Sequence, residues 1–196
     1  MPFNKYPWAQ KYGWLQDKYG LSWQLSMSEN HKMDKRITPS LMFTQGGAGK
    51  AKEAVEFYTS IFKNSKIDMM MPYGKDEGDE EGFIKHSRFS LDGVNFVAMD
   101  SSGKHDFIFN EAISFIVNCE NQEEIDYYWE KLSAVPGSEQ CGWLKDKYGV
   151  SWQIVPTIMN KMLGEGSKEQ AERVTEAFLK MKKFDIKTLE EAYNEA

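Results

Sequence analysis

Residues Gly13-Trp-Leu-Gln-Asp-Lys-Tyr-Gly-Leu-Ser-Trp-Gln-Leu25 recur as Gly142-Trp-Leu-Lys-Asp-Lys-Tyr-Gly-Val-Ser-Trp-Gln-Ile154. Ten of the 13 positions are identical, and the two copies lie 129 residues apart. Each copy predicts a β-hairpin, because Asp-Lys-Tyr-Gly supplies turn residues between two segments that alternate in the manner of strands. A segment repeated at about one domain length indicates a tandem array.

The position of the repeat divides the chain into three predicted parts. Residues 1–35 are expected to be the last two strands of a preceding domain, 36–160 a complete domain, and 161–196 a helical extension. The chain has 196 residues, of which 41% are apolar, so it can bury a core of its own.

The complete domain begins with a β-α-β-β-β pattern. A strand over 37–44 precedes an amphipathic helix, whose apolar residues Ala54, Val55, Tyr58, Ile61 and Phe62 follow helical spacing. Three strands follow, and Asp92-Gly93 marks a hairpin turn between the last two. These strands are predicted over residues 66–73, 83–91 and 94–100.

The same order of elements then starts again. A strand over 112–118 leads to a helix with Asn121 and Glu124 in N-cap positions. Closing strands are predicted over 138–142, 143–145 and 150–155. After Pro156 the pattern becomes helical, with a capping box at Ser167 and Gln170 and a last helix starting near Asp185 or Thr188.

Composition limits the classes of binding partner and the cellular location that can be expected. The net charge is -6, and the basic residues are scattered along the chain, which argues against nucleic-acid binding. No stretch approaches the roughly 20 apolar residues that span a membrane. The two cysteines, Cys119 and Cys141, show no disulfide or zinc spacing, which favours a reducing, cytoplasmic environment.

Several segments carry a family resemblance: residues 109–115, Cys119, Trp129 and above all Cys141–Pro156. With these segments the chain resembles the PhnB-like branch of the vicinal oxygen chelate superfamily, which includes glyoxalases, bleomycin resistance proteins and extradiol dioxygenases. The resemblance implies an α+β fold in which paired βαβββ modules form a U-shaped mixed sheet, here with C-terminal helices added. It also implies a small ligand on the concave face and a dimer or pseudo-dimer.

Metal-using members of the superfamily resemble one another in four inward-facing His, Gln or Glu ligands. By local context these positions fall on Gln153, on Ala112 with Ser114 nearby, near Thr38 or Ser40, and near Met99 or Asp100. Such a set is weak for a divalent ion. His31, His86 and His105 lack metal-ligand spacing to each other. We therefore expect no bound metal and no cofactor.

A ligand site can still be predicted on the concave face. Gln153 points away from Trp152 by strand alternation, and its amide could orient a ligand together with Ser114 and Asn110. A structural hydrogen bond is the alternative role for Gln153. An aromatic pocket for the ligand is predicted from Phe43, Phe96, Phe115, Met99, Trp143 and Trp152, each of which could instead belong to the core.

Two apparent signals for other chemistry are weak. Gly46–Lys50 lacks the leading Gly and the final Ser or Thr of a phosphate-binding loop. PhnB-like proteins often carry a demethylubiquinone methyltransferase label, but nothing here resembles the Gly-rich loop of common methyltransferases.

Three functions remain open, and the sequence does not decide whether the protein is an enzyme. The first is a metal-independent small-molecule-binding protein. The second is a divalent-metal-dependent lyase, isomerase or dioxygenase with a site around Gln153 and Asp100. The third is a domain-exchanged interaction module without catalysis, because the strands in residues 1–35 would seek a sheet in a homodimer or strand-exchanged assembly.

Overall fold

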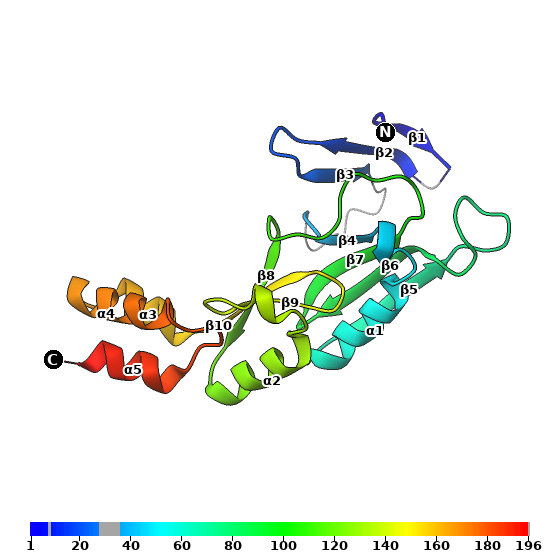
Figure 1. Ribbon diagram of the computed structural model, residues 1–196. Helices are drawn as coiled ribbons and strands as arrows, with labels where there is room; N and C mark the ends of the chain where they lie inside the picture. The colour runs from blue at the N-terminus through cyan, green and yellow to red at the C-terminus, as the bar shows by residue number, and fades with distance from the viewer. Residues whose placement is uncertain (8, 28–35, 196) are drawn as a thin grey trace. The chain divides into compact units, whose positions relative to one another are not determined.

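The computed structural model describes residues 1–7, 9–27 and 36–195 (Figure 1). The chain forms two compact units, Met1–Thr38 and Pro39–Ala196. Within the described residues, no helix is both long enough and apolar enough to cross a membrane.

The first unit is a three-stranded antiparallel sheet in the order β1-β2-β3. Its strands are β1 (Asn4–Tyr6), β2 (Ala9–Gln16) and β3 (Ser22–Met27). The hairpin predicted from the repeat is confirmed, since β2 and β3 pair with Trp14 opposite Gln24. Strand β1 was not predicted.

The second unit starts with the predicted β-α-β-β-β module. Its elements are β4 (Ser40–Phe43), α1 (Ala51–Ile61), β5 (Lys66–Pro72), β6 (Ile84–Leu91) and β7 (Val94–Asp100). The strands form one sheet in the order β4-β7-β6-β5, and only the β4–β7 pair is parallel. This order follows from the crossover helix α1, because a parallel partner needs a long connection while hairpins join antiparallel strands.

The second module has three strands in place of the expected four. It consists of β8 (Ser114–Cys119), α2 (Gln122–Leu132), β9 (Trp143–Lys145) and β10 (Ser151–Pro156), in the sheet order β8-β10-β9. Its pairing repeats the first module, since β8 runs parallel to β10. Asn121 caps α2 as predicted, by accepting from the amide of Glu124 at 2.9 Å.

The predicted strand over residues 138–142 is wrong. Residues Pro136–Ser138 form a 3₁₀ turn, and a single bridge joins Gln140 to Trp143. The amides of Cys141 and Gly142 instead donate to the carbonyls of Met181 and Lys182, at 2.9 and 2.7 Å. Both donors have positive φ angles, so the chain leaves the extended conformation at this point.

Three helices complete the second unit: α3 (Ile158–Gly164), α4 (Lys168–Phe178) and α5 (Ile186–Asn194). The capping box at Ser167 and Gln170 is confirmed, and Asp185 caps α5. Phe184 and Leu189 are buried in the same core as the two modules. The structure therefore packs these helices into the second unit.

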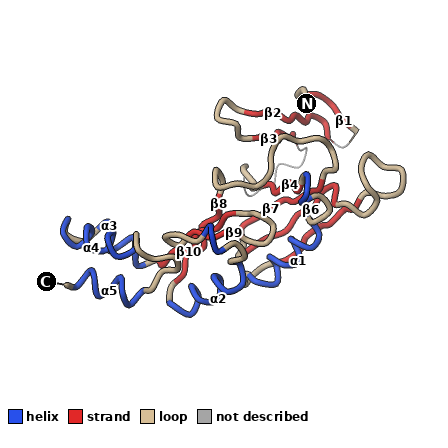
Figure 2. Tube along the Cα trace, in the orientation of Figure 1, coloured by secondary structure: helices blue, strands red, loops and turns tan. Residues whose placement is uncertain are grey.

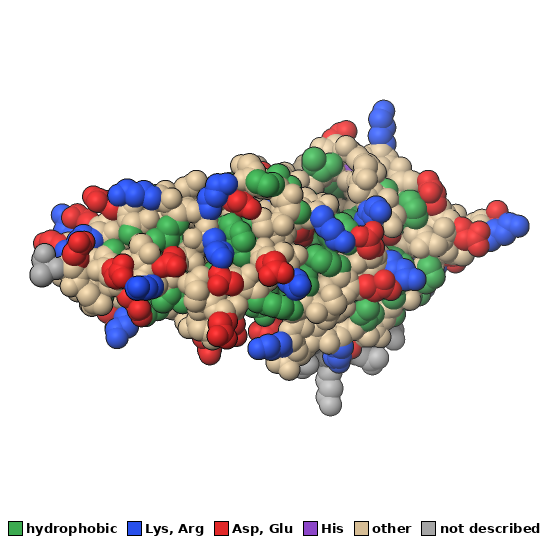
Figure 3. Space-filling view, turned by 60° about the horizontal axis from the view of Figure 1, so that its bottom comes forward, with side chains coloured by type: hydrophobic (Ala, Val, Ile, Leu, Met, Phe, Trp, Pro, Cys, Tyr) green, Lys and Arg blue, Asp and Glu red, His purple; other side chains and the backbone are tan. Residues whose placement is uncertain are grey.

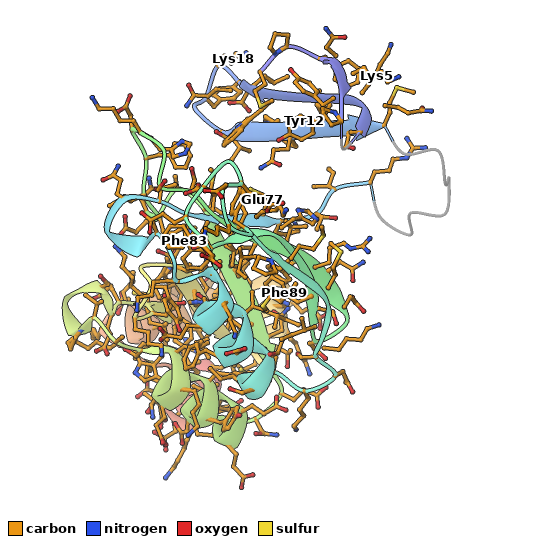
Figure 4. All side chains as sticks on the ribbon, turned by 90° about the vertical axis from the view of Figure 1, so that its right-hand side faces the viewer. Lys5, Tyr12, Lys18, Glu77, Phe83 and Phe89 are labelled. Atoms are coloured by element: carbon orange, nitrogen blue, oxygen red, sulfur yellow. The ribbon has the colours of Figure 1, made fainter. Side chains whose placement is uncertain are left out.

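Both sheets of this unit are covered on one side. Helices α1 and α2 lie on the same side of the strands (Figures 1 and 2). Phe89, labelled in Figure 4, is buried on this side. We call the opposite side of the two sheets the open face. The outer surface of the helix-covered side carries acidic and basic side chains intermixed (Figure 3).

The two sheets and the helices that cover them confirm the α+β class and the paired modules.

Candidate ligand-binding face

The open face of the second sheet is defined by its register. Gln153 lies between Trp143 on β9 and Ile116 on β8. Neighbouring residues on these strands point to the helix-covered side and are buried, as for Trp152 and Ile154. Since side chains of a strand alternate between faces, Gln153 is directed to the open face.

The structure brings together two of the predicted site residues on this face. The amide nitrogen Nε2 of Gln153 donates to Oγ of Ser114 at 2.8 Å, and both side chains are half-buried. Trp143, also half-buried, lies opposite Gln153 in the register. Among the described residues, no hydrogen bond reaches the amide oxygen of Gln153. The register therefore places a hydrogen-bonded polar pair and an indole side chain on the open face.

Three of the predicted pocket residues lie elsewhere. Phe43, Phe96 and Trp152 are at most 6% exposed and belong to the hydrophobic core on the helix-covered side. The Phe96 ring contacts the half-buried ring of Phe115, with centroids 5.1 Å apart. The structure corrects their expected place on the concave face: alternation identifies the two faces of a strand but does not tell which face a helix covers.

Two further predicted site residues do not join Gln153 and Ser114. Asn110 is exposed in the loop before β8, where its side-chain oxygen accepts from the amide of Ala112 at 2.9 Å. Met99 lies on the open face of the first sheet, opposite Met42 in the register.

Asp100 has a structural role that sequence reasoning missed. It is 3% exposed, and its two oxygens accept from the amides of Ala51, at 3.0 Å, and Ile84, at 2.8 Å. It thereby holds the first turn of α1 against the sheet, although burial raises the pKa of this carboxyl. Asp100 lies on the helix-covered side and Gln153 on the open face, so the structure does not bring these two together as a metal site.

The open face of the first sheet carries side chains that were not predicted as site residues. Arg88 lies opposite Met69 on β5 and Val97 on β7, and His86 lies opposite Met71. The period-two pattern of β6 could have indicated them, because Arg88 and His86 alternate with the buried Ser87 and Phe89. The loop residues Ser101 and His105 contact each other at 2.9 Å and lie outside this face.

The other candidate metal ligands and nucleophiles lie in surroundings that do not favour metal binding or reactivity. Among the described residues, no three His, Cys, Asp or Glu side chains gather as a metal site; His31 lies outside those residues. Burial raises the pKa of the Cys119 thiol to about 12, which makes it unreactive at neutral pH.

Gly49, just before α1, allows a close packing contact. A Cβ atom on Gly49, whose φ is +82°, would lie 2.7 Å from the ring of Phe83, labelled in Figure 4. The close approach of this ring explains the glycine without a phosphate ligand.

A family model described as "3-demethylubiquinone-9 3-methyltransferase" matches residues 35–155. This match covers both modules. The chain belongs to this family, the PhnB-like branch of the vicinal oxygen chelate superfamily.

One solved structure agrees with the family assignment, and a second shares the fold. A putative 3-demethylubiquinone-9 3-methyltransferase, PhnB protein, from Bacillus cereus is 41% identical over 63% of this chain and 100% of its own, with a TM-score of 0.55. A protein from Pseudomonas aeruginosa is 20% identical over 63% of this chain and 98% of its own, with a TM-score of 0.50.

More distant proteins share less with this PhnB-like chain. A fosfomycin resistance protein from Listeria monocytogenes, solved with Mn(II) and sulfate, is 13% identical over 68% of this chain and 98% of its own. Its TM-score is 0.42, so nothing about its metal is carried over. A search of curated proteins gave no match.

Proposed function

We propose that this PhnB-like chain is a metal-independent small-molecule-binding protein whose ligand lies on the open face. The observation that carries the proposal is the 2.8 Å hydrogen bond from Gln153 to Ser114, half-buried and next to Trp143. Small-ligand sites commonly combine an apolar surface with a few placed polar groups, and this arrangement has both.

Each of these side chains has a distinct part in binding. The Gln153 amide oxygen accepts a hydrogen bond from a ligand hydroxyl or amine, while Ser114 fixes the orientation of the amide. The indole of Trp143 offers a flat apolar surface beside them. The pair therefore sets the orientation of a ligand, and the ring supplies contact area.

Metal independence is supported by the chemistry of the side chains at the usual ligand positions. The residues at or near these positions that lie on the open face are Ser40, Met99, Ser114 and Gln153, which offer hydroxyl, thioether and amide groups. The other candidates at these positions are Thr38, Ala112 and Asp100. Divalent ions with open positions for substrate oxygens prefer imidazole and carboxylate ligands. The buried Asp100, which supplies a carboxylate nearby in sequence, is held by backbone amides.

Native mass spectrometry of protein purified without chelators tests this proposal. The wild-type chain should retain a non-covalent ligand that Gln153→Leu loses, and neither should hold a stoichiometric divalent ion. Asn118→Leu, which removes an exposed amide from β8, is the matched control and should keep the ligand. One tightly held divalent ion per wild-type chain would overturn metal independence.

A second function, self-association, is favoured by the repeated hairpin. Leu15 and Leu25 of the first copy are 45% and 43% exposed, whereas the equivalent Leu144 and Ile154 are 1% and 0% exposed. The same apolar face is thus buried in one unit and exposed in the other, which supports a homodimer or strand-exchanged assembly. Light scattering tests it: the double variant Leu15→Lys, Leu25→Lys should be monomeric if the wild type is a dimer, and equal masses would oppose it.

The proposed location is the cytoplasm. Cys119 and Cys141 are both free thiols, as expected in a reducing compartment.

A further inference from the structure

Arg88 occupies the middle of the open face of the first sheet. Its strand, β6, lies between β7 and β5, so Arg88 has Val97 on one side and Met69 on the other. The side chain is exposed, while both neighbours are half-buried. Arg88 is therefore flanked in the sheet by residues with apolar side chains on both neighbouring strands.

The next row of the same face is also rich in methionine. Met71 lies opposite His86, two residues before Arg88, and Met42 lies opposite Met99. All of these share the face of Arg88, because residues two apart on a strand point to the same side. Methionine side chains are flexible and polarisable, so they adapt to apolar molecules of different shapes.

No carboxylate neutralises Arg88 among the described residues. Asp68, on the neighbouring strand β5, pairs with Lys66 at 2.8 Å. His86 lies two residues before Arg88 on β6, on the same face, and its pKa is lowered, first by burial and then by the charge of Arg88. The face thus combines one unpaired cation and a neutral imidazole with a methionine surface.

We infer that the open face of the first sheet binds a small apolar molecule with an oxyanion group, which contacts Arg88 through that group and the methionines through its apolar part. The planar guanidinium matches carboxylate and phosphate oxygens in a two-bond geometry that few other groups offer. His86 adds a hydrogen-bond donor without a second charge. This inference rests on the proposed function, because it assigns a ligand class to a second region of the same open face.

Isothermal titration calorimetry with two probes tests the inference, at physiological salt to screen nonspecific attraction. The probes are octanoate and 1-octanol, which have the same number of carbon atoms, so that their alkyl chains differ by one methylene. Octanoate should bind the wild-type chain at least tenfold more tightly than Arg88→Gln, with Arg88→Lys between them. Binding of 1-octanol should be the same in all three.

Lys85→Gln is the matched control. It removes one positive charge from the same strand, at a side chain already paired with Glu77, and it should bind octanoate as the wild type does. An octyl phosphate titration shows whether carboxylate or phosphate is the preferred group.

Equal octanoate and octyl phosphate affinities for wild type and Arg88→Gln would overturn the inference, as would an equal loss in Lys85→Gln. Absence of binding by both anions would overturn it as well. None of these outcomes decides the proposed function, which is tested separately by the ligand retention of Gln153→Leu.

Discussion

The hydroxyl group of Tyr58 on α1 donates a 2.7 Å hydrogen bond to Oδ2 of Asp146 in the β9–β10 turn. The same oxygen accepts from Nε1 of Trp152 at 2.8 Å, and the other oxygen accepts from the amides of Tyr148 and Val150. All of these groups lie in the repeated hairpin except Tyr58, which belongs to the first module. This carboxyl therefore fixes the turn and joins the two modules.

Replacing Tyr58 by Phe should destabilise the second unit by about 1–3 kcal/mol, the usual effect of removing one partner from a buried hydrogen bond. Asp146→Ala should cost more, because it leaves the Tyr58 hydroxyl, the Trp152 indole and two amides without their acceptor. Urea unfolding measures both. Asp17→Ala, the equivalent change in the first hairpin, should leave this transition unchanged, and a similar loss there would contradict the account.

The two hairpins offer an internal comparison of burial. Asp17 repeats the bonds of Asp146, since it accepts from the amides of Tyr19 and Leu21 and from Nε1 of Trp23. Ile154→Ala should cost about 2–5 kcal/mol, because the side chain is fully buried. Leu25→Ala should change stability little in a monomer. A large, concentration-dependent loss for Leu25→Ala would show that the first hairpin is buried by self-association.

Glu53 gives a prediction about acid stability. Bonds from Lys147, Tyr148 and Lys50 lower its pKa from 4.5 to about 2. A carboxylate with a lowered pKa in the folded state stabilises the protein above pH 4.5, and this contribution disappears as the pH falls toward 2.

Urea midpoints at successive pH values should therefore fall more steeply over that range for the wild type than for Glu53→Gln. The effect should be small, because Glu53 is 49% exposed and solvent screens its ion pairs. Parallel pH curves for the two proteins would contradict this role of Glu53.

Gly142 should tolerate no side chain. Its φ is +80°, and a Cβ atom would lie 2.9 Å from the carbonyl oxygen of Ile154 and against the ring of Phe184. We expect Gly142→Ala to destabilise by at least about 1–3 kcal/mol, as strained backbone and overpacking do. Gly137→Ala, with no atom within 4 Å of its added Cβ, should be near neutral in the same thermal unfolding measurement.

Most of the order of elements along the chain could be predicted from the sequence, because it depends on local patterns. The hairpins were indicated by Asp-Lys-Tyr-Gly and Asp92-Gly93, and the caps at Asn121 and Ser167 by short spacings. The strand predicted over 138–142 failed for a non-local reason. Its amides bond to residues 181 and 182, which no pattern within the segment reveals.

The candidate site was only partly predictable for a related reason. Family context and alternation placed Gln153 and Ser114 in one predicted site, and a hydrogen bond joins the two side chains in the structure. Phe43, Phe96 and Trp152 were misplaced because both faces of their strands carry apolar residues, so composition does not distinguish the helix-covered face. Arg88 was missed although the period-two pattern of β6 indicates its face, because its neighbours Met69 and Val97 are identified only by the register of the sheet.

Ligand binding to the open face can be measured by NMR of chains labelled at the methionine methyl groups, with octanoate as the added ligand. We expect shifts at the open-face residues Met42, Met69, Met71 and Met99, and none at the buried Met159 and Met162. Shifts confined to Met159 and Met162, or none at any methionine at saturating octanoate, would contradict binding to the open face.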